Sequence, residues 1–549
     1  MYFKRVIIAL SVTGLAAAFS LGLFTRPVVK GTDSAGFSAV RVAADIEVIS
    51  REPHSLENPK ARAKVRNYLV QRLTEIGFSV EVKHYDSVRM RSGEYTSIAN
   101  IHATAMPLKG KPGSFLLMIA HYDSRHTFRA GEEVHYSLGA ADDGYGLGVI
   151  LESAYLAMKY RQEWRQGFRV IFTDAEENNL DGIKKAIEHE PMFFSDAGLA
   201  INLEARGVKG PAILFETSAG NSELTELYGK ADYPYSYSLT TAIYKALPND
   251  TDFSPVKEIV PGFNFSVIDN LDFYHTKHDN YSNISLSSIQ HYGSQIEPVV
   301  EEYLKGERYS DSSLLKGAED FVYFTVPFLG IISFTAGSYL FVNILMLILF
   351  AASLLFAFRA KRVSLKGYSR GLILIIFLAL ALSLLSYAGT RILCALNGAD
   401  YRMISLAHLK YDEIYNIAVI SLIFPVVYLT NSLMIRKQML SNLEIAIASQ
   451  TILSLTAILL LIQTGENFFI IVPLSVSLLT FIGGDDHFAR LVSLPGIFLS
   501  VITVTPFIYS IHVALASGAL FIPVFYTALL AFSLMPAAYT FTRKIAKSN

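Results

Sequence analysis

Two stretches of this sequence decide the fold of its first half: residues 114–124, SFLLMIAHYDS, and residues 168–177, FRVIFTDAEE. Each is a short apolar run of strand length that ends abruptly in acids or histidine. In an open α/β sheet, ligands bind beyond the carboxyl ends of the strands, and these polar residues occupy that position. The two stretches therefore predict a sheet with a polar site along one edge.

The same alternation of strand-like and helix-like patterns continues through residues 36–305. The other apolar runs are 79–84, 97–103, 198–203, 211–215 and 263–268, and helical periodicity occupies 36–50, 59–77, 145–160, 181–189, 221–231 and 285–305. Strands that alternate with helices form parallel sheets covered on both faces. We therefore expect an α/β three-layer sandwich with a mostly parallel central sheet.

Acids and histidines follow several of these runs. Asp142 precedes a helical segment, and Glu204 and His275 follow two further apolar runs. Because strand ends of this kind meet at one rim, two histidines and three carboxylates can gather there, and such a set suits a pair of zinc ions. Two ions need a bridging carboxylate to hold them roughly 3.5–4 Å apart. The single cysteine, Cys394, excludes a disulfide framework and a thiolate metal cluster.

These motifs together resemble a known family, the co-catalytic di-zinc aminopeptidases. The motifs that occur in the family's order and at similar intervals are HYDS (121–124), GAADD (139–143), DAEENNLDG (174–182), NLEA (202–205) and YHTKHD (274–279). The resemblance covers approximately residues 36–305. With the apolar second half included, the chain looks like the membrane branch of the family, the vacuolar membrane proteases and endoplasmic-reticulum metallopeptidases.

The resemblance implies the metal ligands. His121, Asp142 and Glu204 would hold one zinc ion. Asp142, Glu177 and His275 would hold the other, so that Asp142 bridges the pair. The implied cofactor is therefore two Zn²⁺ ions per chain.

The resemblance also implies catalytic roles. Glu176 would be the general base that takes a proton from the metal-bound water and passes it to the leaving amine, because a carboxylate bound tightly to zinc is a poor proton acceptor. Asp123 would orient His121 through its second ring nitrogen. Tyr274 matches a tyrosine that in some relatives hydrogen-bonds the developing oxyanion. Asp279 would be a supporting acid behind the ligands.

Four positions depart from the family pattern without removing a ligand. Asp143 stands where asparagine is common, and Asn179 stands where glycine is usual. Arg206 and Lys209 follow Glu204 where small residues are frequent. The basic pair could alter the substrate rim, so specificity is what these departures put in doubt.

The second half of the chain has the composition of a membrane domain. Hydrophobic residues make up 52% of the chain, the mean hydropathy is +0.35, and charge-free runs dominate from residue 321 onward. A helix needs roughly 20 apolar residues to cross a bilayer. The charge-free runs cover 6–24, 321–358, 371–390, 414–435, 445–465, 467–484 and 491–542.

We therefore expect three domains: an N-terminal membrane anchor in 1–31, a di-zinc peptidase domain in 32–310, and an all-α multi-span transmembrane domain of about seven spans in 311–549. Small residues at 16–18 leave a cleaved signal peptide as the alternative to the anchor. The total is eight spans, or nine if residues 321–334 also cross. That segment is rich in β-branched and aromatic residues, so a strand or an interfacial segment is the other interpretation.

Basic residues indicate the orientation in the membrane. With eight spans, the basic loops after residues 358 and 435 and the basic C-terminal tail fall on the same side as Lys4 and Arg5. The positive-inside rule then places residues 32–320 on the non-cytoplasmic side. The single cysteine favours a bacterial inner membrane, and the resemblance implies a vacuolar or endoplasmic-reticulum membrane as the alternative.

The function implied by the resemblance is hydrolysis of peptide bonds by a membrane-bound zinc metallopeptidase that removes N-terminal residues. Its partners would be a peptide substrate and the lipid bilayer. The net charge of −1 gives no indication of a nucleic-acid partner, and the oligomeric state stays open. Two other functions also stay open: a glutaminyl-cyclase-like transferase, which generally relies on one zinc ion, and a transporter or scaffold with a peptidase-like binding domain.

Overall fold

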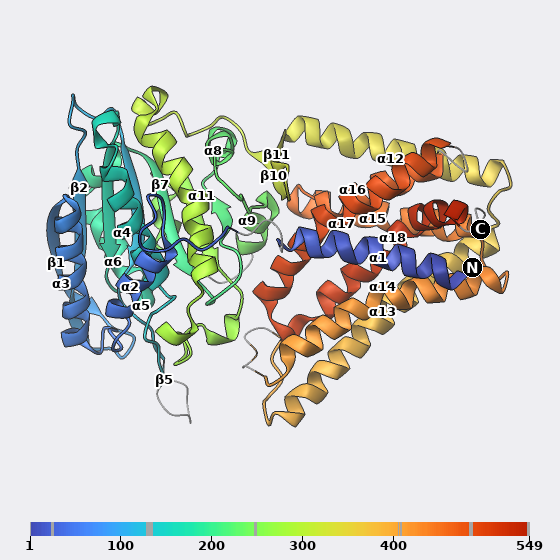
Figure 1. Cartoon of the computed structure of the whole chain (residues 1–549), viewed down its shortest axis with the longest axis horizontal. Coiled ribbons are helices and arrows are strands. Elements are labelled where there is room, and N and C mark those ends of the chain that lie inside the picture. Colours follow the sequence, from blue (N-terminus) through green and yellow to red (C-terminus); the bar gives the residue numbers. More distant parts are fainter. Residues whose placement is uncertain are drawn as a thin grey trace. The chain divides into compact units, whose positions relative to one another are not determined.

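The computed structural model describes residues 2–22, 27–127, 135–245, 250–403, 406, 409–482 and 487–545 of the chain (Figure 1). The chain forms two compact units. The first is globular and continues to Thr325, with Gly330–Ala336 added to it. The second contains helix α1 and the chain from Gly337 onward. The globular unit thus extends further along the chain than residue 310.

The globular unit is built on a seven-stranded sheet in the order β1-β2-β6-β3-β7-β9-β8. Its strands are β1 (Ser79–Arg89), β2 (Tyr95–Ala105), β3 (Phe115–His121), β6 (Gly167–Thr173), β7 (Ala197–Ala205), β8 (Ile213–Thr217) and β9 (Gly262–Val267). The four central strands, β6, β3, β7 and β9, are mutually parallel. Strands β1, β2 and β8 pair in antiparallel fashion at the two edges. The predicted parallel sheet is therefore confirmed at the centre, and the edges differ from it.

Helices cover both faces of this sheet, as the sandwich prediction requires. On strand β3, Leu116 and Met118 face one hydrophobic core and Leu117 and Ile119 face the other, which is the period-two alternation of a strand buried on both sides. The first core includes residues of α2 (Ala39–Ile49), α3 (Pro59–Ile76), α4 (Gly144–Met158), α8 (Ser222–Tyr228) and α11 (Leu286–Lys305). The second includes residues of α6 (Asp181–His189), α7 (Met192–Ser195) and α10 (Phe253–Val256).

Local sequence signals explain where these helices begin and end. Asn58 caps α3 by accepting a hydrogen bond from the Ala61 amide, and Pro59 occupies the first turn, where its missing N–H costs nothing. Gly77 ends the helix with φ at 109°, a left-handed conformation that glycine adopts without strain. Two short α-helices remain in the unit, α5 (Glu176–Asn179) and α9 (Ser238–Lys245), and α5 carries part of the site described below. A two-stranded ribbon pairs β4 (His126–Thr127) with β5 (His135–Tyr136).

The segment of uncertain assignment, 321–358, contains both a hairpin and a helix. Residues Phe321–Val326 and Gly330–Thr335 form the paired strands β10 and β11. Helix α12 starts immediately afterwards, at Ala336. The strand interpretation of 321–334 is confirmed, and this segment does not form an additional spanning helix.

The second unit is helical. Its elements are α1 (Tyr2–Ser20), α12 (Ala336–Arg359), α13 (Leu365–Leu396), α14 (Asp412–Arg436), α15 (Asn442–Thr464), α16 (Phe468–Ile482), α17 (His487–Leu515) and α18 (Phe521–Ile545). Among the described residues, six of these helices, α12 to α15, α17 and α18, are long and apolar enough to cross a membrane. Helices α1 and α16 contain shorter apolar segments. The count of eight spans therefore stays a prediction.

Within this unit, α18 occupies the centre. It packs against α1, α13, α14, α15, α16 and α17, and 78% of the residues in its apolar stretch, Phe521–Ala538, are buried. By contrast, only 17% of the residues in an apolar 18-residue stretch of α12 are buried, so its large apolar side chains are available to lipid. Six helices of this kind fit an integral membrane protein.

Candidate metal centre

The carboxyl ends of the central strands bring the predicted ligands together. His121 is the last residue of β3, and Glu204 is the penultimate residue of β7. Glu177 lies in α5, directly after β6, and His275 lies in the loop that follows β9. Because β6, β3, β7 and β9 are adjacent and parallel, these positions share one edge of the sheet.

Asp142 reaches this edge from the loop before α4, where its neighbour has a different task. Asp143 caps α4: its carboxylate accepts from the Gly146 amide at 2.9 Å and lies 3.3 Å from the His121 amide. A Cβ atom at Gly146 would lie 2.4 Å from that carboxylate, so only glycine fits there. Because the Asp143 carboxylate caps α4, Asp142 is the acid that faces the site.

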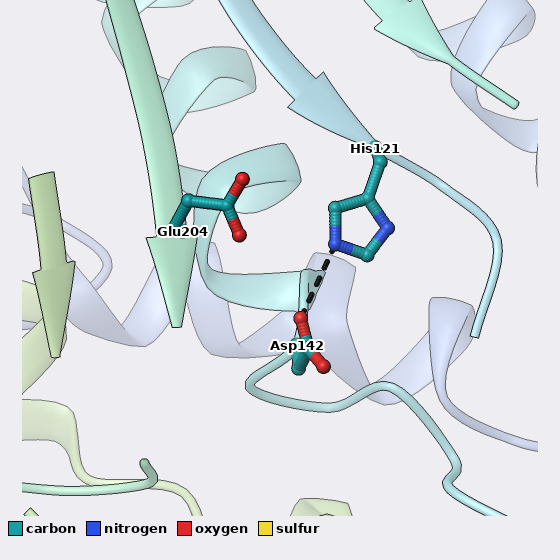
Figure 2. A group of neighbouring side chains, drawn as sticks. All are labelled: His121, Asp142 and Glu204. Carbon is teal, nitrogen blue, oxygen red and sulfur yellow. Dashed lines mark hydrogen bonds and ion pairs between the residues drawn. The ribbon is translucent and has the colours of Figure 1, made fainter. Parts of the chain in front are cut away.

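The first group of ligands is His121, Asp142 and Glu204, whose ligand atoms all lie within 4.8 Å of one another (Figure 2). His121 Nε2 lies 3.2 Å from Asp142 Oδ1. Figure 2 shows the Glu204 carboxylate turned toward the space between the other two side chains. All three residues are buried.

The second group is Asp142, Glu177 and His275. His275 Nε2 lies 3.3 Å from Asp142 Oδ2 and 3.0 Å from Glu177 Oε1. Asp142 thus belongs to both groups and offers a different oxygen to each. Asp142 Oδ2 and Glu177 Oε1 are both buried and both face the single ring nitrogen His275 Nε2, and a cation at this place would compensate their charge. This nitrogen and oxygen donor set fits zinc.

The electrostatics of the site also favour cations. Burial lowers the pKa of His275, but Glu177 and Asp142 outweigh it and raise that pKa to about 9. Burial likewise opposes protonation of His121, yet Asp123 and Asp142 raise its pKa well above the ordinary value. Burial raises the pKa of Glu204 to about 8. Without metal, therefore, the site gathers protons to compensate crowded carboxylates, and these are the protons that dications would replace.

The predicted general base, Glu176, lies beside the two groups without belonging to either. It is partly exposed, and its side chain forms no hydrogen bond or ion pair with the part of the chain that the structure describes. Burial, and then the charges of Glu204 and Glu177, raise its pKa well above the usual range, while His121 lowers it. Nearby dications would favour its ionised form.

Asp123 supports both ligand groups. Its carboxylate oxygens accept hydrogen bonds from the amides of Glu176 and Glu177, at 3.0 and 3.3 Å. Its backbone carbonyl lies 3.0 Å from His121 Nδ1, whereas its carboxylate is 3.6 Å from the same nitrogen. The ring of His121 is therefore held by the main chain of Asp123 more closely than by its side chain.

Tyr274 and Asp279 occupy the far side of the site. The Tyr274 ring stacks on His275 with centroids 3.6 Å apart, and within the described ranges its hydroxyl forms no hydrogen bond. Burial above all raises the pKa of Tyr274 well above its usual value, so the hydroxyl keeps its proton. Asp279 accepts from the amide of Ala141 at 2.6 Å and from that of Asp142 at 3.3 Å, which fixes the bridging loop.

Two contacts to ligands were not predicted. Arg125 Nη1 lies 3.1 Å from Glu177 Oε2 and donates to the Glu177 carbonyl at 2.6 Å. Asn202 donates to Glu204 Oε1 at 3.2 Å and to Asn264 at 2.9 Å. Arg125 lies two positions after Asp123, and Asn202 lies two positions before Glu204. This short distance along the chain from predicted site residues is the sequence feature that could have indicated them, but it does not indicate which ligand each residue contacts.

Part of the chain is similar to known proteins. Residues 100–300 match the family model "Peptidase family M28". Endoplasmic reticulum metallopeptidase 1 of Mus musculus is 30% identical over 224 residues, which cover 40% of this chain and 24% of that protein. The vacuolar membrane protease of Candida dubliniensis is 28% identical over 304 residues, which cover 52% of this chain and 30% of that protein. The chain thus matches only about a quarter to a third of the length of these relatives.

Two solved structures are similar to about half of this chain. A Zn-dependent exopeptidase from Parabacteroides distasonis is 20% identical and covers 48% of this chain and 98% of its own, with a TM-score of 0.39. The glutaminyl cyclase of Porphyromonas gingivalis is 19% identical with the same coverage and a TM-score of 0.40. The predicted resemblance to metallopeptidases is confirmed by the match of residues 100–300 to this family model and by the named relatives.

Proposed function

We propose, from the premise that residues 100–300 form an M28 peptidase domain, that this protein is a membrane-bound zinc aminopeptidase with two zinc ions per chain. The observation that carries the proposal is the sharing of Asp142 between two ligand groups, one oxygen to each. A bridging carboxylate is what a two-metal hydrolase needs. His121 and Glu204 would complete one site, and Glu177 and His275 the other.

The catalytic residues would act around these ions. Zinc supplies a Lewis acid that acidifies water and polarises the scissile carbonyl. Glu176 lies outside both ligand groups, so its carboxylate can accept a proton from the attacking water and deliver it to the leaving amine. Tyr274 keeps its proton and can donate to the oxyanion as negative charge develops. Asp123 accepts hydrogen bonds from the amides of Glu176 and Glu177 and so fixes the backbone that carries the proposed base and the neighbouring metal ligand.

The test of this mechanism is the Glu176→Gln variant of the full-length protein in detergent. It should retain zinc and lose about 10²- to 10⁴-fold in release of an amino acid from a chromogenic amide, the usual contribution of a general base. Glu188→Gln, the same change at an exposed glutamate on α6, is the matched control and should keep full activity. Full activity in Glu176→Gln would refute the role of Glu176.

Metal content separates the proposal from its alternative. Two zinc ions per chain, measured by mass spectrometry of the metal, support the peptidase, whereas one tightly bound ion would favour the glutaminyl-cyclase-like transferase. A scaffold with a peptidase-like binding domain would bind peptide without turnover in the wild type. The retention of every predicted ligand in two groups supports the enzyme over the scaffold.

We also propose that the globular unit lies on the non-cytoplasmic side of a bacterial inner membrane. The basic loops after residues 358 and 435 support the orientation, and the single cysteine supports the bacterial location. The named relatives belong by their names to the endoplasmic reticulum and the vacuole. A cysteine introduced at the exposed Lys230 in a Cys394→Ser background should react with an impermeant maleimide added outside intact spheroplasts. Reaction only after lysis would reverse the orientation.

A further inference from the structure

Arg206 occupies a place beside the metal centre that the proposed mechanism does not use. It directly follows β7, and its amide still donates to the Val267 carbonyl of β9 at 2.8 Å, so the strand pairing continues to this residue. Residues two apart on a strand project from the same face, about 6.6 Å from each other along the chain. The side chain of Arg206 therefore leaves the sheet on the same face as the ligand Glu204.

The guanidinium of Arg206 has no acidic partner in the ranges that the structure describes. It lies 5.6 Å from the centre of the Tyr274 ring, which itself stacks on the ligand His275. The side chain is partly exposed. The other arginine near the ligands, Arg125, is already paired with Glu177. Arg206 thus presents an uncompensated cation at the accessible margin of the site.

We propose that Arg206 forms a subsite for a substrate carboxylate next to the bond that is hydrolysed. A planar guanidinium matches a carboxylate through paired hydrogen bonds. The inference rests on the proposed peptidase function and adds the class of substrate, which is acidic. The carboxylate has two possible sources in a peptide: an acidic side chain or the free α-carboxylate of a dipeptide.

Matched peptides distinguish these sources. The zinc-loaded full-length protein is assayed with Leu-Glu amide against Leu-Gln amide, with Glu-Ala amide against Met-Ala amide, and with Leu-Ala against Leu-Ala amide. In at least one pair the carboxylate-bearing peptide should have a kcat/KM higher by about tenfold to a hundredfold, the usual range for a hydrogen-bonded charge. The pair that shows the preference identifies the source of the carboxylate.

The variants then assign the preference to the subsite. Arg206→Gln should bring the ratio of kcat/KM values close to one, and Arg206→Lys should restore part of the preference. Lys230→Gln removes one exposed positive charge elsewhere in the same unit and should leave the ratio unchanged. The zinc content of each variant is also measured, because a variant that has lost its fold would no longer bind zinc.

Two outcomes would overturn the subsite. One is a wild type without preference in any of the three pairs. The other is an Arg206→Gln variant whose kcat/KM falls by the same factor for both peptides of a pair, because Arg206 would then act only by supporting Tyr274. Equilibrium binding of the same pairs to Glu176→Gln gives the discrimination without turnover. If the wild type hydrolyses none of the peptides, the peptidase proposal fails, and the binding ratio alone then upholds or refutes the carboxylate subsite.

Discussion

Replacement of Asp123 by asparagine tests the link between the two halves of the metal centre. Asp123 is fully buried, and its two oxygens accept from the amides of Glu176 and Glu177 at 3.0 and 3.3 Å. Asparagine keeps the shape but has only one acceptor oxygen, and its NH₂ group would point at the second amide. At least one charge-assisted hydrogen bond is lost, at about 1.5–3 kcal/mol, and one buried N–H is left without an acceptor.

The loss should appear as weaker zinc binding. The short segment that carries Glu177 is anchored by these two hydrogen bonds, and the Asp123 carboxylate is 3.6 Å from His121 Nδ1. Changes to residues that support metal ligands typically cost 10- to 100-fold in metal affinity, which equals about 1.4–2.8 kcal/mol and agrees with the hydrogen-bond figure. We therefore expect Asp123→Asn to weaken binding of zinc by about 10- to 100-fold.

Competition with a chelator of known affinity, on the full-length protein in detergent, measures this change. Asp86→Asn is the matched control, because Asp86 is exposed on β1 and the chemical change is the same. It should bind zinc as the wild type does. If Asp123→Asn also binds zinc with wild-type affinity, the carboxylate does not organise the centre and the reasoning is wrong.

Three further predictions concern charges in the globular unit. The affinity for zinc should rise with pH up to about 9, because zinc must displace the proton on His275. Burial lowers the pKa of His275, but Glu177 and Asp142 outweigh burial and raise it to about 9. A zinc affinity that titration calorimetry finds constant between pH 6 and 9 would contradict this prediction. The same raised pKa stabilises the metal-free fold below the ordinary value of 6.5, and that stability is lost as the pH rises through 9. Lys257→Met should lower the free energy of unfolding by about 3 kcal/mol, because it leaves the fully buried Glu216 without the ammonium group that lies 2.6 Å away. Urea unfolding followed by fluorescence of Trp164, the single tryptophan, measures this, and Lys257→Met with Glu216→Gln should recover much of the loss.

The local sequence predicted the elements of the globular unit and the residues that gather in its two candidate ligand groups. Strand runs such as 114–120 and 168–173 were predictable because burial on both faces requires a short, continuous apolar run, and this is a property of neighbouring residues. The predicted ligands His121, Asp142, Glu177, Glu204 and His275 meet because parallel strands end at one edge, which topology alone implies. Hydropathy likewise marks the apolar helices, since the length of a span is set by the bilayer.

Tertiary structure decided what depends on contacts between distant residues. The antiparallel edges formed by β1, β2 and β8 follow from which strands find each other, and apolar runs carry no sign of direction. Only the folded chain shows that Asp143 is used up as a helix cap while Asp142 faces both ligand groups. The pairing of Arg125 with Glu177 joins residues 52 positions apart, and Arg206 has no acidic partner among the residues that the structure describes. Sequence spacing determines which residues can approach a site, but only the packed structure determines which charges are compensated there.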